Sequence, residues 1–182
     1  MRNEDVSISK AIAIILMVMA HAHIPLWGQQ YINMFHMPLF FIFSGYCFKE
    51  KYLANPKMFV SKKVRGIYWP FVKWSLFFLL LHNLFFYLDI YNGEYGFKGN
   101  VSELYTLRDY AVHAFNIITR MSDQEQLLGG FWFLKSLFWA SLFGFILIKK
   151  TKSLILGGGI AFIFSFLCVI TNFHIPFFYV GQ

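Results

Sequence analysis

Apolar residues occur along the chain in about five long runs that are separated by polar links. The runs cover approximately Ile8–Trp27, Tyr31–Phe48, Trp69–Leu88, Phe131–Ile148 and Leu154–Thr171. Each run is close to the ~20 residues that a helix needs to cross a hydrocarbon core of about 30 Å. The pattern predicts an all-α fold, a polytopic membrane helix bundle with about five transmembrane helices in a single domain over residues 1–182.

The first run has a second interpretation as a cleaved signal peptide, because "AHA" at residues 20–22 resembles a small-x-small cleavage site. Two features favour a membrane helix instead. The next apolar run follows after a very short turn. The residues before the first run also carry both signs of charge, in Arg2, Glu4 and Asp5.

Two of the links are long enough to form helices. In the link over residues 89–130, Thr106 and Asp109 of "TLRDYAVHAFNIITRM" have the spacing of a capping box. One face of this helix would carry Leu107, Tyr110, Ala111, Ala114, Phe115 and Ile118. We predict an amphipathic helix that lies on or dips into the membrane interface. The link "NPKMFVSKKVRGIYWP" predicts a short surface helix with its basic face toward anionic lipid or a phosphorylated ligand.

The composition agrees with a membrane protein. Hydrophobic residues make up 58% of the 182 residues and charged residues 14%, whereas about a quarter of a soluble domain is charged. The formal net charge is +7, and seven of the sixteen Lys and Arg lie between residues 49 and 73. Such clustering is typical of a cytoplasmic loop, so we expect a lipid bilayer and no nucleic acid as partner. Cys47 and Cys168 lie inside apolar runs and predict neither a disulfide framework nor a metal site.

The basic links also predict the orientation of the chain. The link over residues 49–73 and "KKTK" at 149–152 are rich in cations, whereas "HIPLWGQQ" at 23–30 contains no Lys or Arg. Cationic links stay on the cytoplasmic side, so the N-terminus would be inside and residue 182 outside. This orientation places Lys10 and Arg65 near the inner face, and His21, His23 and His36 near the outer face.

Lys10 and His21 are eleven positions apart in the first run. Eleven steps of 100° leave an offset of about 20°, and the rise is about 16 Å, so both side chains would leave one helix face about half a membrane apart. Ionisable groups inside a membrane usually face a protein interior or a watery cavity. The alternative is that Lys10 only snorkels to the inner headgroups and that His21 only marks the outer interface.

His36 begins the second run, in "MFHMPLFF", where Pro38 fits an early helical turn. His36 would then lie close to the outer end of the first helix, and imidazoles at one depth can serve as a base and its orienting partner. A metal site is the less favoured alternative because neither a third firm ligand nor a carboxylate is near, so we predict no metal. We interpret His23 as a loop or interface residue.

The other conspicuous residues have less specific interpretations. Trp132, in "GGFWFLKSLFWA", is placed to wall the same outer pocket, with interfacial packing as the alternative. Ser44 and Gly45 in mid-membrane are interpreted as packing residues. Structural roles are predicted for His82, His113 and His174.

Four segments resemble those of a known family. They are "ISKAIAIILMVMAHAH" at residues 8–23, "NMFHMPLFFIFSGYCF" at 33–48, "KKVRGIYWPF" at 62–71 and "GGFWFLKSLF" at 129–138. Together and in this order, the four segments resemble those of the acyltransferase-3 family of integral membrane acyltransferases. They are especially similar to its fucose O-acetylase-like branch. Lys10 stands where other members of the family frequently have arginine.

The resemblance implies an O-acyltransferase of a bacterial-type inner (plasma) membrane. Such an enzyme takes an acyl group, commonly acetyl, from cytoplasmic acyl-CoA as donor substrate and passes it to a hydroxyl of an extracytoplasmic saccharide. It needs no permanently bound cofactor. His21 would be the general base or a transient acyl carrier, and His36 would orient it or share its proton. The candidates for binding acyl-CoA are Lys10, Lys62, Lys63 and Arg65, and Trp132 would shape the acceptor pocket.

The family usually has about ten membrane helices, twice the number predicted here. We therefore expect the chain to be the N-terminal half of the family fold, C-terminally truncated, or to form a homo-oligomer that completes the fold. Two further interpretations remain, a transporter or flippase-type protein and an inactive fragment that acts as a partner subunit. Ionisable groups suited to a transport pathway occur only in the first two predicted helices, which favours the enzyme.

Overall fold

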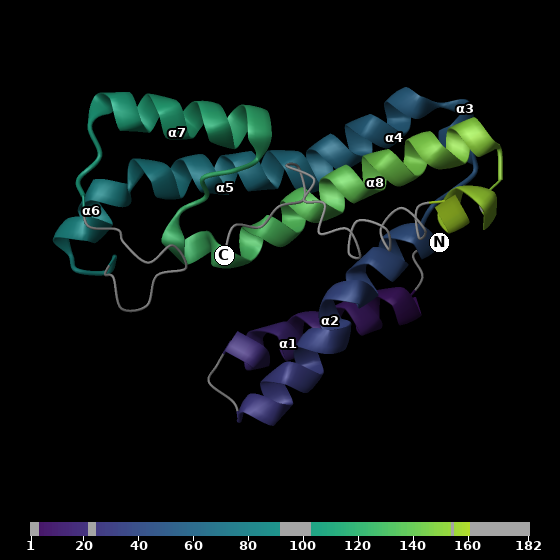
Figure 1. Ribbon diagram of the computed structural model, residues 1–182, viewed down its shortest axis with the longest axis horizontal. Helices are drawn as coiled ribbons and strands as arrows, with labels where there is room; N and C mark the ends of the chain where they lie inside the picture. Colours follow the sequence, from purple (N-terminus) through teal and green to yellow (C-terminus); the bar gives the residue numbers. More distant parts are fainter. Residues whose placement is uncertain (1–3, 22–24, 92–102, 154, 161–182) are drawn as a thin grey trace. The chain divides into compact units, whose positions relative to one another are not determined.

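The computed structural model describes residues 4–21, 25–91, 103–153 and 155–160 (Figure 1). All regular elements in these ranges are helices and none is a β-strand, so the predicted all-α class is confirmed. The chain divides into two compact units, Met1–Tyr52 and Leu53–Gln182.

The first unit is a helical hairpin. Helix α1 (Glu4–His21) has Glu4 and Asp5 in its first turn, where negative charge complements the helix dipole. Helix α2 (Leu26–Tyr46) follows after four residues and keeps Pro38 within it. The two helices pack against each other, with Ala13 of α1 and Ile32 of α2 buried. These helices agree with the first two predicted segments. The short helix α3 (Lys51–Ala54) follows.

The second unit begins with a long helix of three parts. They are α4 (Pro56–Lys63), the π-helix η1 (Val64–Tyr68) and α5 (Trp69–Leu80). The Asn55 side chain caps the first turn by accepting a hydrogen bond from the Met58 N–H at 3.2 Å, and Pro56 occupies a position where a missing N–H costs little. The dihedral angles at both joints are helical, so the chain runs without a break from Pro56 to Leu80.

This continuous helix differs from the prediction for the basic link. The link is helical, as predicted, but it continues into α5 and does not form a separate surface helix. The third predicted segment, Trp69–Leu88, is interrupted at Leu81, whose N–H bonds to the Phe78 carbonyl, and resumes as α6 (His82–Tyr87). Contacts of His82 and Asn83 with residues 103–125, described below, accompany this interruption.

Helix α8 (Trp132–Thr151) packs antiparallel to the long helix and is preceded by the 3-10 helix η2 (Gln126–Phe131). Four side-chain contacts define the register: Phe59 stacks on Phe145 at 4.5 Å, Lys63 bonds to Ser141, Tyr68 lies against Phe138, and Phe71 lies against Phe131. A buried cluster of Phe71, Val72, Leu79, Ile117, Met121 and Phe138 forms the core of this unit.

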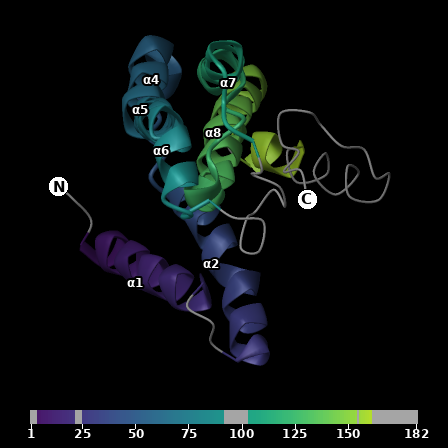
Figure 2. The ribbon, with the colours of Figure 1, turned by 90° about the vertical axis from the view of Figure 1, so that its left-hand side faces the viewer.

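Helix α7 (Leu107–Arg120) confirms the predicted helix and its capping box. Thr106 and Asp109 exchange both hydrogen bonds, with the Thr106 N–H to Asp109 Oδ2 distance at 2.9 Å. Figure 1 and Figure 2 both show α7 beside α5, and Ile117 and Met121 belong to the shared core. Helix α7 is therefore a packed part of the second unit, and its predicted place in the membrane interface stays a prediction.

One helix in the described ranges is long and apolar enough to cross a membrane, namely Gln126–Thr151 with 26 residues. Helix α1 carries three charged residues, Glu4, Asp5 and Lys10, within its 18 residues. The fifth predicted segment lies mostly outside the described residues, and 155–160 are helical. The count of five membrane helices remains a prediction.

Candidate functional site

Lys10 and His21 both belong to α1, so the regular helix that their spacing requires is present. The Lys10 side chain is half-buried, and its Nζ lies 5.9 Å from the centre of the Phe43 ring of α2. This cation–π contact holds the ammonium group between the two helices. His21 is the last residue of α1, and its side chain lies outside the described part of the structure.

His36 lies within α2, and its side chain is likewise outside the described part. The backbone register still relates it to His21. Because Lys10 lies opposite Phe43 in an antiparallel hairpin, residue 17 of α1 lies opposite His36. His21 is four residues further along α1, a rise of about 6 Å. Along the axis of the hairpin, the two histidines are thus about one helical turn apart.

The three basic residues of the link have different surroundings. The Lys63 ammonium group donates a hydrogen bond to Ser141 Oγ at 3.0 Å and lies 5.5 Å from the centre of the Phe59 ring. Lys62 and Arg65 are exposed. The π-helix begins at Val64, and its Trp69 N–H bonds to the Val64 carbonyl five residues back. Single π-helical turns occur frequently at functional sites because they change the direction of neighbouring side chains.

Trp132 begins α8 and is half-buried, with its ring 6.3 Å from that of Phe133 in an edge arrangement. It precedes Ser141, the partner of Lys63, by nine residues. Nine residues correspond to about 14 Å along a helix, so Trp132 and the basic residues lie at different levels of α8.

The predicted site residues therefore divide between the two units. The first unit contains Lys10, His21 and His36, and the second contains Lys62, Lys63, Arg65 and Trp132. Lys10 and His21 lie at different levels of α1, and Lys63 and Trp132 lie at different levels of α8.

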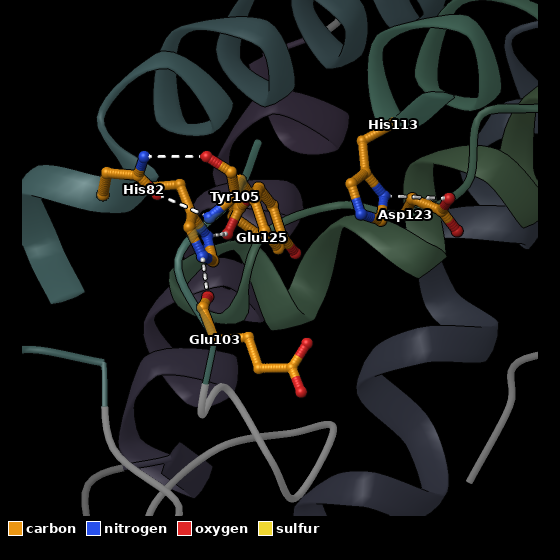
Figure 3. A network of polar contacts seen from close by, with 7 residues as sticks. His82, Glu103, Tyr105, His113, Asp123 and Glu125 are labelled. Carbon is orange, nitrogen blue, oxygen red and sulfur yellow. Dashed lines mark hydrogen bonds and ion pairs between the residues drawn. The ribbon is translucent and has the colours of Figure 1, made fainter. Parts of the chain in front are cut away.

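The second unit also contains a buried polar network whose partners were not predicted (Figure 3). His82 Nδ1 lies 2.9 Å from Glu125 Oε2, and the side chains are 0% and 3% exposed. The Tyr105 ring stacks on His82 with centroids 3.4 Å apart and an angle of 4° between the planes. The Asn83 amide bonds both backbone groups of Tyr105, at 2.8 and 3.0 Å.

A second imidazole extends the network beyond Tyr105. The Tyr105 ring, which stacks on His82, also stacks on the His113 ring, with centroids 4.7 Å apart. His113 Nδ1 lies 3.2 Å from Asp123 Oδ2. Asn116 donates a hydrogen bond to the same Asp123 oxygen at 2.7 Å. This part is more open, since His113 and Asp123 are 28% and 27% exposed.

Burial determines the electrostatics of the network. Desolvation raises the pKa of Glu125 above its ordinary value and outweighs the hydrogen bond and charge of His82, which lower it. Burial and then the charge of Glu125 raise the pKa of Tyr105 to about 12. The same two causes raise the pKa of Tyr91, whose ring lies 5.3 Å from that of His82.

The network connects α6 with the segment 103–125, and its central imidazole is fully buried. His82 Nε2 also lies 3.4 Å from the Glu103 carbonyl oxygen, so both ring nitrogens face protein groups. This arrangement fixes backbone segments in place and leaves no exposed nitrogen for a substrate. Sequence reasoning gave His82 and His113 structural roles but missed their partners, because His82 and Glu125 are 43 residues apart. His174 lies outside the described residues.

Comparison with known families gives the class of the protein. The model of a family described as "Acyltransferase domain" matches residues 3–182. The chain belongs to this family, the acyltransferase-3 family, whose members are typically membrane-associated acyltransferases. No curated protein and no solved structure matched the chain.

Proposed function

We propose that the chain is a membrane O-acyltransferase of the fucose O-acetylase-like branch, which moves an acetyl group from cytoplasmic acyl-CoA to a hydroxyl of an extracytoplasmic saccharide. The observation that carries the proposal is the family match over residues 3–182. The hairpin α1–α2 supports it, because Lys10 and His21 share one regular helix, about 16 Å apart along its axis.

In the proposed reaction His21 acts as the general base. Its imidazole takes the proton of the acceptor hydroxyl while the hydroxyl oxygen attacks the thioester carbonyl carbon. The new ester C–O bond forms as the C–S bond breaks, and the proton passes from the imidazolium to the departing CoA thiolate. His36, about one turn away in level, orients His21 or shares its proton.

The basic residues bind the donor in this proposal. Arg65 lies in the π-helix and Lys62 lies just before it, and both are exposed. Arginine is well suited to bidentate contacts with phosphate. Lys63 contributes positive charge while its contact with Ser141 keeps α4 against α8. Lys10 holds the phosphate or pantetheine end of the donor, and Trp132 walls the acceptor pocket. Along α8, Lys63 lies at the level of Ser141 and Trp132 lies nine residues closer to Gln126, so in this proposal the cation lies on the cytoplasmic side of the acceptor residue.

We also propose that Gln126–Thr151 crosses a bacterial-type inner membrane with Lys149 and Lys150 at its cytoplasmic end. Its length and hydropathy permit a crossing, and its last turn carries both lysines. Cations at the cytoplasmic end follow the positive-inside rule.

The test is acetylation of surface glycans in cells that carry the full gene, with His21→Ala compared with the wild type at equal protein levels. We expect His21→Ala to abolish glycan acetylation, because no other group would remove the hydroxyl proton. The matched control is His23→Ala, two residues away and outside the proposed site, which should retain acetylation. Equal acetyl content in cells with wild-type protein and with His21→Ala would refute the proposal.

A further inference from the structure

The segment 103–125 is fastened to the rest of the second unit at two different levels. At one level Asn83 bonds the backbone of Tyr105, and His82 pairs with Glu125. At the other level the Tyr68 hydroxyl donates a hydrogen bond to the Ile118 carbonyl at 2.7 Å. The earlier residue, Tyr68, contacts the later residue, Ile118, and Asn83 contacts Tyr105, so α7 runs antiparallel to α5. Tyr68 and Asn83 are 15 residues apart, so this contact extends along most of α5.

These two levels correspond to the end and the middle of the helix that we propose to cross the membrane. Glu125 directly precedes Gln126, where the candidate span begins. Tyr68 lies with its ring 5.8 Å from that of Phe138, which is 12 residues from Gln126 and 13 from Thr151. Ile117 and Met121 share the buried cluster with Phe138. The C-terminal end of α7 therefore lies near the middle of the span.

The length of α7 agrees with this placement. Its 14 residues rise about 21 Å, which is close to half the length of a 26-residue helix. A helix that lay flat in the interface would cross the axis of α8 and could not follow α5 from Asn83 to Tyr68.

An uncharged apolar stripe remains uncovered on α7. Leu107, Phe115 and Ile118 are 90%, 59% and 45% exposed, and Ala111 between them is exposed as well. Ile117 and Met121, which face the core, are almost completely buried. Arg120 is exposed at the same end of α7, but it lies about 200° around the helix axis from Ile118 and therefore outside the stripe.

Backbone polar groups inside a membrane need hydrogen-bonding partners, and the first residues of the return from α7 have them. The chain turns at Met121 with a left-handed conformation, and the N–H groups of Met121 and Ser122 reach the Asn116 carbonyl. Asp123 accepts from Asn116, and Glu125 pairs with the buried His82.

We propose that residues 103–125 form a re-entrant hairpin, which enters the membrane at the end where α8 begins, reaches its middle and returns. The stripe of Leu107, Ala111, Phe115 and Ile118 contacts lipid acyl chains along its length. This inference depends on the proposed crossing by Gln126–Thr151 but not on acyl transfer.

The test measures depth along α7 in the full chain reconstituted in phosphatidylcholine vesicles. Spin labels are placed at Leu107→Cys, Ala111→Cys, Phe115→Cys and Ile118→Cys in a background with Cys47→Ser and Cys168→Ser. Power saturation with oxygen and with a water-soluble nickel chelate gives the depth of each label. Ile146→Cys, on the exposed apolar side of α8, is the control for the crossing.

We expect depth to increase steadily from 107 to 118, by up to about 16 Å for eleven residues. Equal shallow depths at all four positions would overturn the hairpin in favour of a flat interfacial helix. High accessibility to the nickel chelate would place the stripe in water, and low accessibility to both reagents would mean that protein covers it; either result overturns lipid contact. A water-exposed label at 146 would overturn the crossing by α8 and the hairpin together, whereas loss of acetylation is tested separately at His21.

Discussion

In the buried His82–Glu125 pair, each side chain depends on the other for a hydrogen bond. Both side chains are almost fully buried and their atoms lie 2.9 Å apart. Removing one member leaves the other buried without its main hydrogen-bonding partner, which costs more than the contact contributes. The stability of the second unit should therefore be sensitive to His82.

We predict that His82→Ala destabilises the protein by about 3 kcal/mol, because Glu125 would remain buried without its partner. Thermal unfolding in detergent, followed by circular dichroism, measures the change. The matched control is His113→Ala, which removes a similar pair whose side chains are about a quarter exposed. The control should cost less than about 1 kcal/mol. Equal losses in both variants would show that burial does not distinguish the two pairs.

Glu125 also gives a prediction about pH. Its pKa in the folded protein is raised, with burial as the largest cause. A carboxyl group with a raised pKa contributes stability that is fully present below its ordinary pKa and is lost as the pH rises through the folded value. We therefore expect the wild type to gain stability relative to Glu125→Gln between about pH 8 and about pH 4. The measurement is the difference in melting temperature at both pH values. A difference that shrinks toward low pH would show that the charge of His82 outweighs burial.

At the level of helices, the sequence predicted several elements well. Long apolar runs and a capping box are local signals, and α1, α2, α7 and α8 appear where these signals placed them. The continuous helix from Pro56 to Leu80 was not predicted, because Lys57, Lys62, Lys63 and Arg65 interrupt its apolar pattern. What orders this segment is its contact with α8, about 80 residues away, as in the pair Lys63–Ser141.

The turn after α8 depends on one glycine. A Cβ at Gly157 would lie 3.0 Å from Thr151 Oγ1 and 3.1 Å from the Cα and N atoms of Ile148. The Ile148 atoms are backbone atoms and cannot move without shifting α8, so the following helix approaches α8 closely only because residue 157 lacks a side chain.

We predict that Gly157→Ala destabilises this turn by about 1–3 kcal/mol, as expected for overpacking. Trypsin cleavage after Lys152 should become faster, and the melting temperature should fall. Gly158→Ala is the matched control, because nothing lies within 4 Å of its added Cβ. The control should leave stability unchanged or raise it by up to about 1 kcal/mol, as alanine favours helix. Our account of the turn is wrong if both variants cleave at the wild-type rate.

For the molecule as a whole, the prediction of the candidate site relied on spacing along single helices. Lys10 and His21 could be related because one helix contains both. The relation of Lys63 to Ser141, or of His82 to Glu125, depends on which helices pack together and in what register. Apolar periodicity does not contain that information, so the buried network and the packing of α7 against α5 could not be predicted from sequence.

The antiparallel register of the long helix and α8 leads to a prediction about topology. Asn55, which caps α4, lies near the end of α8 that carries Lys149 and Lys150, because Phe59 stacks on Phe145. Asp89 follows α6 near the other end, where His82 pairs with Glu125. Both residues are exposed. If α8 crosses the membrane, the helices from Pro56 to Tyr87 must cross it in the opposite direction.

We therefore expect Asn55→Cys and Asp89→Cys to be labelled from opposite sides, in a background with Cys47→Ser and Cys168→Ser. A membrane-impermeant maleimide applied to intact cells should label Asp89→Cys, since cationic segments remain in the cytoplasm and residue 89 would be outside. Asn55→Cys should react only after the membrane is permeabilised. Reversed labelling would keep the crossing but invert the proposed orientation, and with it the sides of donor and acceptor. Labelling of both positions in intact cells would show that this pair of helices does not cross the membrane.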